Sequence, residues 1–352
     1  MTVVRTRRRG APVVLALTLG LTLASSGVPP AHAQAGQAPS RSAPATSPAI
    51  LTWPPPPAQA RIQFVRTLDP AAVRGKPSIL SKVWKAFVGA GDEPRMLRPY
   101  GIAVGPDRKV YVADTFGRAI HVYDLAKPGY SSVRVDGQSL IGVAYSGGLL
   151  FVTDSATSRL LCLDTKGHTR WTLGRKDGFE RPTGLVVAGD RLHVVDSLRH
   201  RVVAVSLAGA VIDTFGEPGN GPGQLNYPTN IARSTDGRLF VTDTMNFRVQ
   251  VFSEDGRYLR AFGRLGDGSG DFDKPKGIAV DSAGHVYVVE GMNDVVQVFD
   301  GSGAFLLAFG GSGSGDGQFW LPSGITIVND VVYVADSANR RVQVFRYLRS
   351  GQ

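Results

Sequence analysis

The sequence contains one short segment repeated six times between about residues 97 and 348. Each copy carries an acidic residue at the same position, and these acids are 40 to 47 residues apart: Asp114, Asp154, Asp196, Asp243, Glu290 and Asp336. The clearest copies begin at Tyr227, Lys274 and Leu321. A repeat of this period, built from short alternating apolar runs, is typical of a propeller blade of about four strands. The sequence therefore predicts an all-β, six-bladed β-propeller.

Each complete copy reads as four strands, a to d, separated by turn residues. In chain order the strands resemble GIAV, VYVAD, RVQVF and YLRAFG, with turns such as 235–237 and 254–256 between them. In strand b, an aromatic or histidine position precedes a valine in every copy: Tyr111, Phe151, His193, Phe240, Tyr287 and Tyr333. Apolar residues on both faces indicate strands that lie between two neighbouring blades.

The sixth copy lacks its fourth strand. The chain almost ends after strand c of this copy, residues 341–345, whereas residues 61–67 alternate like a strand d. Pairing of 61–67 outside 341–345 would close the ring and remove an unpaired sheet edge. Apolar residues at helical spacing predict one short helix before blade one, over about 78–88. The propeller would then span 60–348, with blades over about 98–348 and a tail at 349–352.

The first 33 residues have the features of a secretory signal peptide. Four arginines between positions 5 and 9 precede an apolar run, 11–23, and Ala31-His32-Ala33 is a small-x-small cleavage site. The run is short for a membrane span, although an uncleaved anchor is the alternative. We expect general secretion or twin-arginine export, a periplasmic or secreted protein, and no membrane span after signal removal. Residues 34–59, rich in Ala, Pro and Ser, are predicted to form a disordered spacer.

Charge and cysteine content narrow the function only slightly. The net charge is +10, but without the four arginines of the signal 35 basic residues face 29 acids, a net charge of +6. This is weak support for nucleic-acid binding. Cys162 is the single cysteine, so no internal disulfide is expected. It stands at an apolar strand position, where a buried, unreactive thiol is the simplest interpretation.

The copies resemble NHL repeats over about residues 98–348. The resemblance rests on the Pro-x-Gly-Ile-Ala-Val segment, the Val-Tyr-Val-Ala-Asp strand, the Asp-Ser/Thr-x-Asn-x-Arg turn and the Val-Gln-Val-Phe strand. It implies a six-bladed propeller. Similar propellers include protein-interaction platforms, RNA-binding domains and a metal-dependent amidating lyase.

The repeated turn places an arginine five residues after the acid that ends strand b. The expected structural pairs are Asp154–Arg159, Asp196–Arg201, Asp243–Arg248 and Asp336–Arg341. Ala119 and Val295 stand at the arginine position in the other two blades, so Asp114 and Glu290 are expected to be unpaired. A pair that recurs in most blades is more consistent with a structural than a catalytic role.

The loops between strands d and a, and the turns between strands b and c, lie at one end of the ring, which we call the loop face. Loops on a rigid frame commonly carry recognition, with exposed aromatic and arginine side chains as anchors. Phe179, Leu225, Phe272 and Phe319 each stand three residues before a proline and are predicted to fill gaps between blades. The candidate ligand contacts are Arg98, Tyr100, Arg181, Tyr227, Lys276 and Trp320.

The first function class that fits is an exported, non-catalytic binding or scaffold module. Its ligand would be an exported protein, a peptide, a glycan or a small molecule, and we expect a monomer. RNA binding is ranked last, and no nucleic-acid partner is expected. Acids such as Asp267, Asp271 and Asp294 lie among the basic residues, and export would remove that partner.

The second class is a metal-dependent propeller enzyme. An amidating-lyase-like zinc site needs about three protein ligands, but the five histidines of the mature chain are expected on different faces: His121, His168, His193, His200 and His285. A lactonase-like calcium site could draw on Asp114, Asp196 and Glu290, although nothing in the sequence singles them out. No cofactor, metal ligand or catalytic residue is therefore predicted, and calcium or zinc enters only under this alternative.

Overall fold

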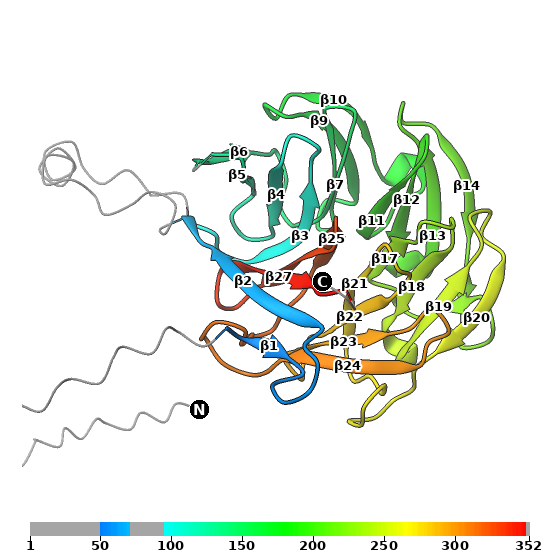
Figure 1. The fold of residues 1–352 in the computed structure, drawn as a ribbon. Coiled ribbons are helices and arrows are strands. Elements are labelled where there is room, and N and C mark those ends of the chain that lie inside the picture. The colour runs from blue at the N-terminus through cyan, green and yellow to red at the C-terminus, as the bar shows by residue number, and fades with distance from the viewer. Residues whose placement is uncertain (1–49, 71–94, 128, 350–352) are drawn as a thin grey trace, which may run out of the picture. The chain divides into compact units, whose positions relative to one another are not determined.

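The computed structural model describes residues 50–70, 95–127 and 129–349, and these form an all-β, six-bladed propeller (Figure 1). Blades 1 to 3 are sheets of four antiparallel strands in chain order from the channel outward. They consist of β3 (Pro99–Val104), β4 (Lys109–Asp114), β5 (Ala119–Asp124) and β6 (Gly129–Arg134); β7 (Leu140–Ser146), β8 (Leu149–Asp154), β9 (Arg159–Asp164) and β10 (Thr169–Leu173); and β11 (Pro182–Ala188), β12 (Arg191–Asp196), β13 (Arg201–Ser206) and β14 (Val211–Phe215).

Blades 4 to 6 repeat this arrangement. Blades 4 and 5 are β17 (Asn230–Arg233), β18 (Leu239–Asp243), β19 (Arg248–Phe252) and β20 (Tyr258–Phe262); and β21 (Pro275–Val280), β22 (Val286–Glu290), β23 (Val295–Phe299) and β24 (Phe305–Gly310). Blade 6 takes β25 (Ile325–Val328), β26 (Val331–Asp336) and β27 (Arg341–Tyr347) from the C-terminal end. Inner strands of successive blades lie in contact around the ring, including β25 with β3.

Blade 6 is completed by a strand from the other end of the chain. Strand β2 (Ile62–Leu68) pairs antiparallel with β27, from Ile62 opposite Tyr347 to Leu68 opposite Val342. The predicted closing strand is confirmed, displaced by one residue. The ring therefore has no open edge at the junction of its ends.

A further strand corrects the predicted extent of the spacer. Strand β1 (Thr52–Trp53) pairs with the outer side of β2. The Trp53 ring lies 6.0 Å from that of Phe309 and 5.8 Å from that of Phe345. Burial of a large aromatic surface ties this segment to blade 6, so the spacer does not reach residue 59 as predicted.

Several predictions fall on residues that the structure does not describe. These are the signal peptide at 1–33, the spacer up to residue 49, the helix over about 78–88 and positions 350–352 of the tail. Arg349, the first residue of the predicted tail, is described, and its Nε donates to Asp330 over 2.8 Å. Among the described residues, no helix is long and apolar enough to cross a membrane.

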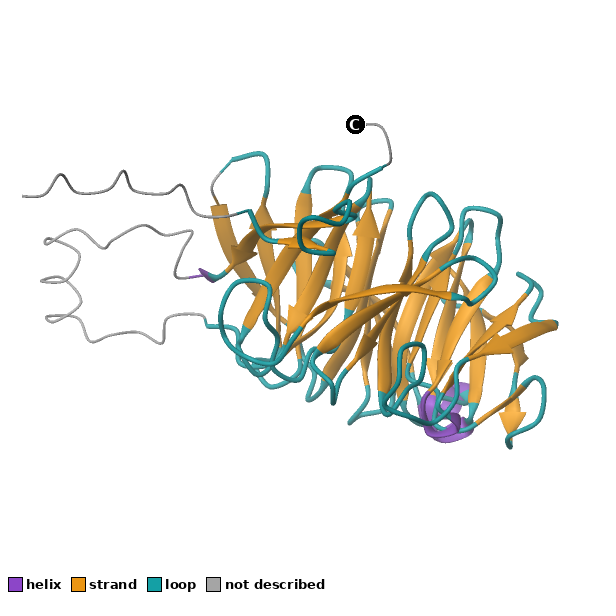
Figure 2. Cartoon of the chain, turned by 60° about the horizontal axis from the view of Figure 1, so that its bottom comes forward, coloured by secondary structure: helices purple, strands orange, loops and turns teal. Residues whose placement is uncertain are grey.

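The core lies between the blades. The strand b position shared by the six copies is buried throughout, from fully buried Phe151, Phe240 and Tyr287 to Tyr333 at 5% exposure. Phe179, Leu225, Phe272 and Phe319 are also buried, which confirms that they fill gaps between blades. Figure 2 shows the turns gathered at the two ends of the strands. Helical turns on the loop face are η1 (Arg175–Asp177), η2 (Ser197–Arg199) and η3 (Thr244–Asn246).

Glycine in strand a lets neighbouring inner strands approach closely. The backbone N–H of Gly184 donates to Thr229 O over 3.0 Å, and that of Gly277 donates to Ser323 O over 2.9 Å. A Cβ on Gly184 would lie 2.6 Å from the Cα of Asn230 in the next blade. The glycine of the repeat therefore permits the blades to contact one another around a narrow channel of about 250 Å³.

Candidate functional site on the loop face

The six repeated acids fix the loops that build this face. All six are fully buried at the end of strand b. Each accepts backbone N–H groups from the segment that leads into strand a of its own blade, at 2.6 to 3.1 Å from the nearer carboxylate oxygen. Segments that precede the inner strands are thus held in place by buried, charge-assisted hydrogen bonds.

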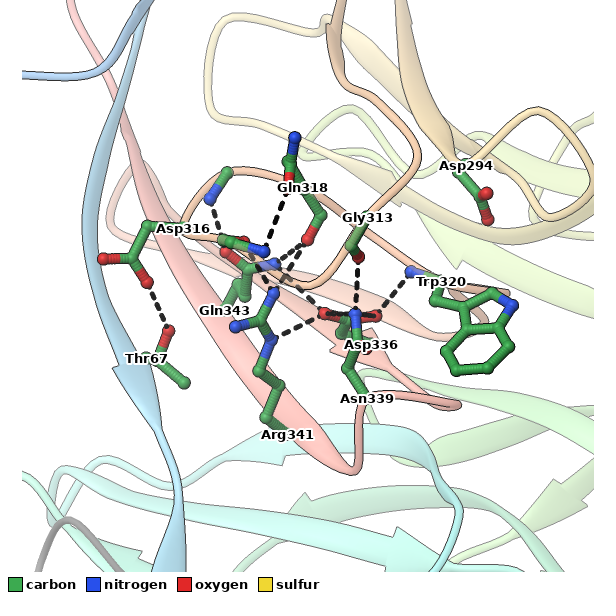
Figure 3. A network of polar contacts seen from close by, with 12 residues as sticks. Thr67, Asp294, Gly313, Asp316, Gln318, Trp320, Asp336, Asn339, Arg341 and Gln343 are labelled. Carbon is green, nitrogen blue, oxygen red and sulfur yellow. Dashed lines mark hydrogen bonds and ion pairs between the residues drawn. The ribbon is translucent and has the colours of Figure 1, made fainter. Parts of the chain in front are cut away.

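The four predicted turn pairs form. Nitrogen–oxygen distances are 2.7 Å for Asp336–Arg341, 2.8 Å for Asp243–Arg248, 3.4 Å for Asp154–Arg159 and 4.0 Å for Asp196–Arg201. In blade 6 the arginine Nη2 also donates to the carbonyls of Gly315 and Gln318 (Figure 3). These arginines therefore link the acid to the incoming loop, which is a structural role.

The prediction that Asp114 is unpaired is wrong. Its Oδ2 lies 3.0 Å from Nε2 of buried His121, whose Nδ1 faces Tyr130. Burial opposes ionisation of Asp114, but the hydrogen bonds from His121 and from backbone N–H groups outweigh it and lower the pKa to about 2. Glu290 has no ion pair with a described residue. Burial raises the pKa of Glu290, with partial compensation from backbone N–H donors such as that of Lys274.

Sequence reasoning missed the role of the glutamine in the Val-Gln-Val-Phe strand. In blade 6, Gln343 Oε1 accepts the N–H of Gly317 over 2.8 Å, and its Nε2 donates to Asp336 over 3.1 Å (Figure 3). Gln250 and Gln297 accept the N–H groups of the matching loop glycines in blades 4 and 5. The glutamine thus anchors the long glycine-rich loop. Its recurrence only in copies with such a loop was the available signal.

Apolar side chains stand exposed along this face. Four come from b-to-c turns and four from the segments that precede strand a. We name them the apolar rim: Phe116, Leu198, Met245 and Met292, with Leu97, Tyr227, Leu265 and Trp320. Phe116 is 61% and Trp320 57% exposed. Aromatic and methionine residues are enriched in protein interfaces, and grouped exposed apolar side chains commonly mark them.

Basic residues gather where the inner strands begin. Tyr100 is partly buried, and burial raises the pKa of its phenol, while the nearby charges of Arg181 and Arg98 lower it. Burial lowers the pKa of Lys276, and the charges of Arg98 and Lys274 lower it further. Arg98 thus lies within electrostatic range of both Tyr100 and Lys276, with Arg181 near Tyr100 and Lys274 near Lys276. We name these five side chains the basic mouth.

The cations of the basic mouth are not neutralised by salt bridges. Among the described residues, none of Arg98, Arg181, Lys274 and Lys276 makes an ion pair, although Glu290 and Asp294 partly offset the positive field at Lys276. The Arg98 guanidinium lies 5.3 Å from the Phe116 ring centre, which joins the mouth to the apolar rim.

The six predicted contacts therefore divide between two parts of the face. Arg98, Tyr100, Arg181 and Lys276 lie in the basic mouth, and Tyr227 and Trp320 lie in the apolar rim. The backbone N–H of Tyr227 donates to His200 Nδ1 over 3.2 Å, and the two rings pack edge to face.

The histidines and the cysteine lie where the sequence places them. His121 and His193 are buried, and burial lowers the pKa of His193 to about 4. His168 and His285 contact Asp164 and Asp281 at the opposite end of the strands. Burial raises the pKa of the Cys162 thiol to about 11. Within the described residues, no group of three or more His, Cys, Asp or Glu side chains could hold a metal ion.

Comparison with known proteins places the repeats in a family. A family model described as a 6-bladed beta-propeller matches residues 225–296, and the NHL repeat model matches residues 319–345. A search of curated protein sequences finds no significant match.

Solved structures similar to this one share its fold at low sequence identity. Virginiamycin B lyase from Staphylococcus aureus is 15% identical with a TM-score of 0.55, covering 72% of this chain and 96% of its own. A gluconolactonase from Xanthomonas campestris is 18% identical with a TM-score of 0.58, covering 72% and 88%. A chain of a nidogen–laminin complex is 17% identical with a TM-score of 0.52, covering 68% and 86%. With six of its described sheets arranged as blades, and with these matches, the chain is an NHL-repeat, six-bladed β-propeller.

Proposed function

We propose that this protein is an exported, non-catalytic binding module. Its loop face receives a segment of a partner protein that carries an acidic side chain between apolar ones. The observation that carries the proposal is the basic mouth beside the apolar rim. Four cations without salt bridges to described residues lie beside aromatic and methionine side chains that are exposed to solvent.

Electrostatics supports an acidic ligand group at the mouth. Burial lowers the pKa of Lys276, and the like charge of Arg98 lowers it further, so the two cations repel one another. An anion placed between these groups relieves that repulsion and gains charge-assisted hydrogen bonds. The Tyr100 phenol adds a neutral donor at the same place.

Rigidity supports binding with little loss of conformational entropy. The buried acids hold each segment before strand a, and in blades 4 to 6 the glutamines also hold the long loops. Side chains on a preorganised face lose less freedom on binding than those on free loops.

Export rests on the pattern of residues 1–33. The experiment for this part is fractionation of producing cells with N-terminal sequencing of the mature protein. Cleavage after Ala33 is the expected result, whereas an intact N-terminus in the cytoplasm would contradict it.

Enzymatic function has less support in the site. The lyase and the gluconolactonase are enzymes, but identities of 15 and 18% show a shared fold alone.

The binding proposal is tested by selecting peptides from a random displayed library on the immobilised propeller. Enriched peptides should contain Asp or Glu flanked by apolar residues. The double variant Arg181→Gln, Lys276→Gln should bind them at least tenfold more weakly. Arg170→Gln, Arg257→Gln is the control, because it removes the same charge away from the loop face. Peptides without acids, or equal losses in both variants, would refute the proposal.

A further inference from the structure

A second candidate binding site lies between blade 6 and blade 1, at the end of the strands opposite the loop face. A groove of about 670 Å³ opens there, beside the a-to-b turns of both blades. Its apolar surface includes Val65 and Val331 from blade 6 and Leu125 from blade 1, and Arg66, Arg108 and Arg346 also line it. The volume is within the range of small-molecule sites.

Within the part of the chain that the structure describes, no side chain of the closing strand β2 forms a hydrogen bond with blade 1 beside this groove. In blade 2, Trp171 of strand d donates from Nε1 to Leu207 O of blade 3 over 3.1 Å. In blade 4, Arg260 donates to Ser302 O of blade 5 over 3.1 Å. Arg66 has the equivalent register in β2, but its guanidinium makes no hydrogen bond with any described residue. The junction where the chain ends meet thus lacks the side-chain bridge found after blades 2 and 4; a smaller groove of about 520 Å³ lies between blades 5 and 6.

Three uncompensated guanidinium groups surround the groove between blades 6 and 1. Arg66 and Arg108 line the groove together with Tyr333. Burial raises the pKa of Tyr333, and the charges of the two arginines act in the opposite direction. Arg66, Arg108 and Arg346 form no ion pair with described residues.

The neighbouring acids already have partners. Asp107 pairs with Lys109 over 2.9 Å, and Asp330 pairs with Arg349 over 2.6 Å. Among the described residues, no acidic side chain lines the groove. A net positive charge therefore remains beside an apolar surface.

We propose that this groove binds a small amphipathic anion, such as a carboxylate with an apolar chain or ring. The apolar part lies against Val65, Leu125 and Val331, and the anionic group is held by the arginines. Guanidinium groups match a carboxylate with paired, charge-assisted hydrogen bonds. This site is independent of the partner proposed for the loop face.

The experiment is a fluorescence titration of the propeller with 1-anilinonaphthalene-8-sulfonate, an amphipathic anion. We expect saturable binding at one site, displaced by decanoate but not by decanamide, which has the same apolar chain without the charge. Arg66→Gln and Arg346→Gln should each raise the dissociation constant about tenfold.

Two variants control for net charge and location. Arg257→Gln removes one exposed charge on a turn of blade 4 at the same end of the strands, and Arg170→Gln removes one from β10 of blade 2, away from both proposed sites. Each should change the dissociation constant by less than about twofold, because screened surface charges contribute little at a distance. Equal weakening in these controls, equal displacement by decanamide, or no saturable binding would overturn the proposal.

Discussion

Blades 1–3 and blades 4–6 have the same sheet but hold their loops differently. In blades 4–6, strand c carries Gln250, Gln297 and Gln343, and each binds a glycine N–H of a long loop. In blades 1–3 the same position carries His121, Leu161 and Val203. Only His121 contacts the buried acid. Blade formation therefore depends on the apolar strands and on the buried acid at the end of strand b. The glutamine contacts of blades 4–6 are an addition that holds the long loops in place.

The two family matches follow this division. They cover residues 225–296 and 319–345, which belong to blades 4 to 6. The glutamines occur in these same blades, whereas blades 1–3 carry His121, Leu161 and Val203 at that position. If this comparison is correct, substitution of the polar residues should lower the unfolding free energy more in blades 4–6 than in blades 1–3.

The largest effect is expected at the junction of the two halves. Deletion of residues 50–68 removes β1 and β2, exposes the edge of β27 and uncovers Phe345. It also removes the Thr67 contact with Asp316, 3.3 Å from hydroxyl to carboxylate (Figure 3). We expect a melting temperature lower by more than about 10 °C, because an unpaired edge and lost apolar burial both destabilise the ring. An unchanged calorimetric transition would contradict this role.

The second-largest effect is expected from substitution of a buried acid, and the loss of stability should differ between the two halves. Asp336→Asn replaces the carboxylate that pairs with Arg341 by a neutral amide. Arg341 then has no opposite charge beside it, so we expect a loss of about 3 kcal/mol in unfolding free energy. Asp196→Asn should cost about 1 kcal/mol or less. There Arg201 lies 4.0 Å away, and burial already raises the pKa of the carboxyl. Urea unfolding of both variants measures the difference, and equal losses would remove the distinction.

The pH dependence tests blade 1, the blade of the first half in which the strand c side chain at the glutamine position, His121, contacts the buried acid. The pKa of Asp114 is about 2 in the folded protein, below its ordinary value of 3.8. Its contribution is therefore complete above about pH 4 and is lost as pH falls toward 2, with a size of about 2 kcal/mol. Melting temperatures of the parent should fall more steeply over this window than those of Asp114→Asn. An equal fall in melting temperature with pH for the parent and the variant would show that Asp114 is not the source of this pH dependence.

The smallest effect should be local to the later half. Gln250→Leu removes the acceptor for Gly223 N–H and should cost about 1 kcal/mol. Hydrogen exchange at that amide should accelerate about fivefold to tenfold, while amides of β8 and β12 keep their rates. Acceleration spread over all blades would indicate a general loss of stability instead.

Much of this architecture is readable from the sequence because each repeat buries the same positions. The six blades, the closing strand and the four acid–arginine pairs follow from period and spacing. Trp53 was missed because proline-rich surroundings carry no strand pattern, and its burial depends on Phe309 and Phe345 far along the chain. The Asp114–His121 contact has the same seven-residue spacing as Asp243–Gln250 and Asp336–Gln343, but a histidine takes the place of the glutamine, so the arginine position five residues after the acid gave no sign of it.

The sequence by itself determined the repeat, its hydrogen-bonded turns and the residues available to the loop face. Only the tertiary structure decided which of them meet. Arg98, Arg181 and Lys276 belong to three different blades, and ring closure brings them to one channel mouth. The groove with Arg66, Arg108 and Arg346 exists only where the two ends of the chain join. Proximity of this kind depends on the curvature and closure of the ring, which no local pattern of residues encodes.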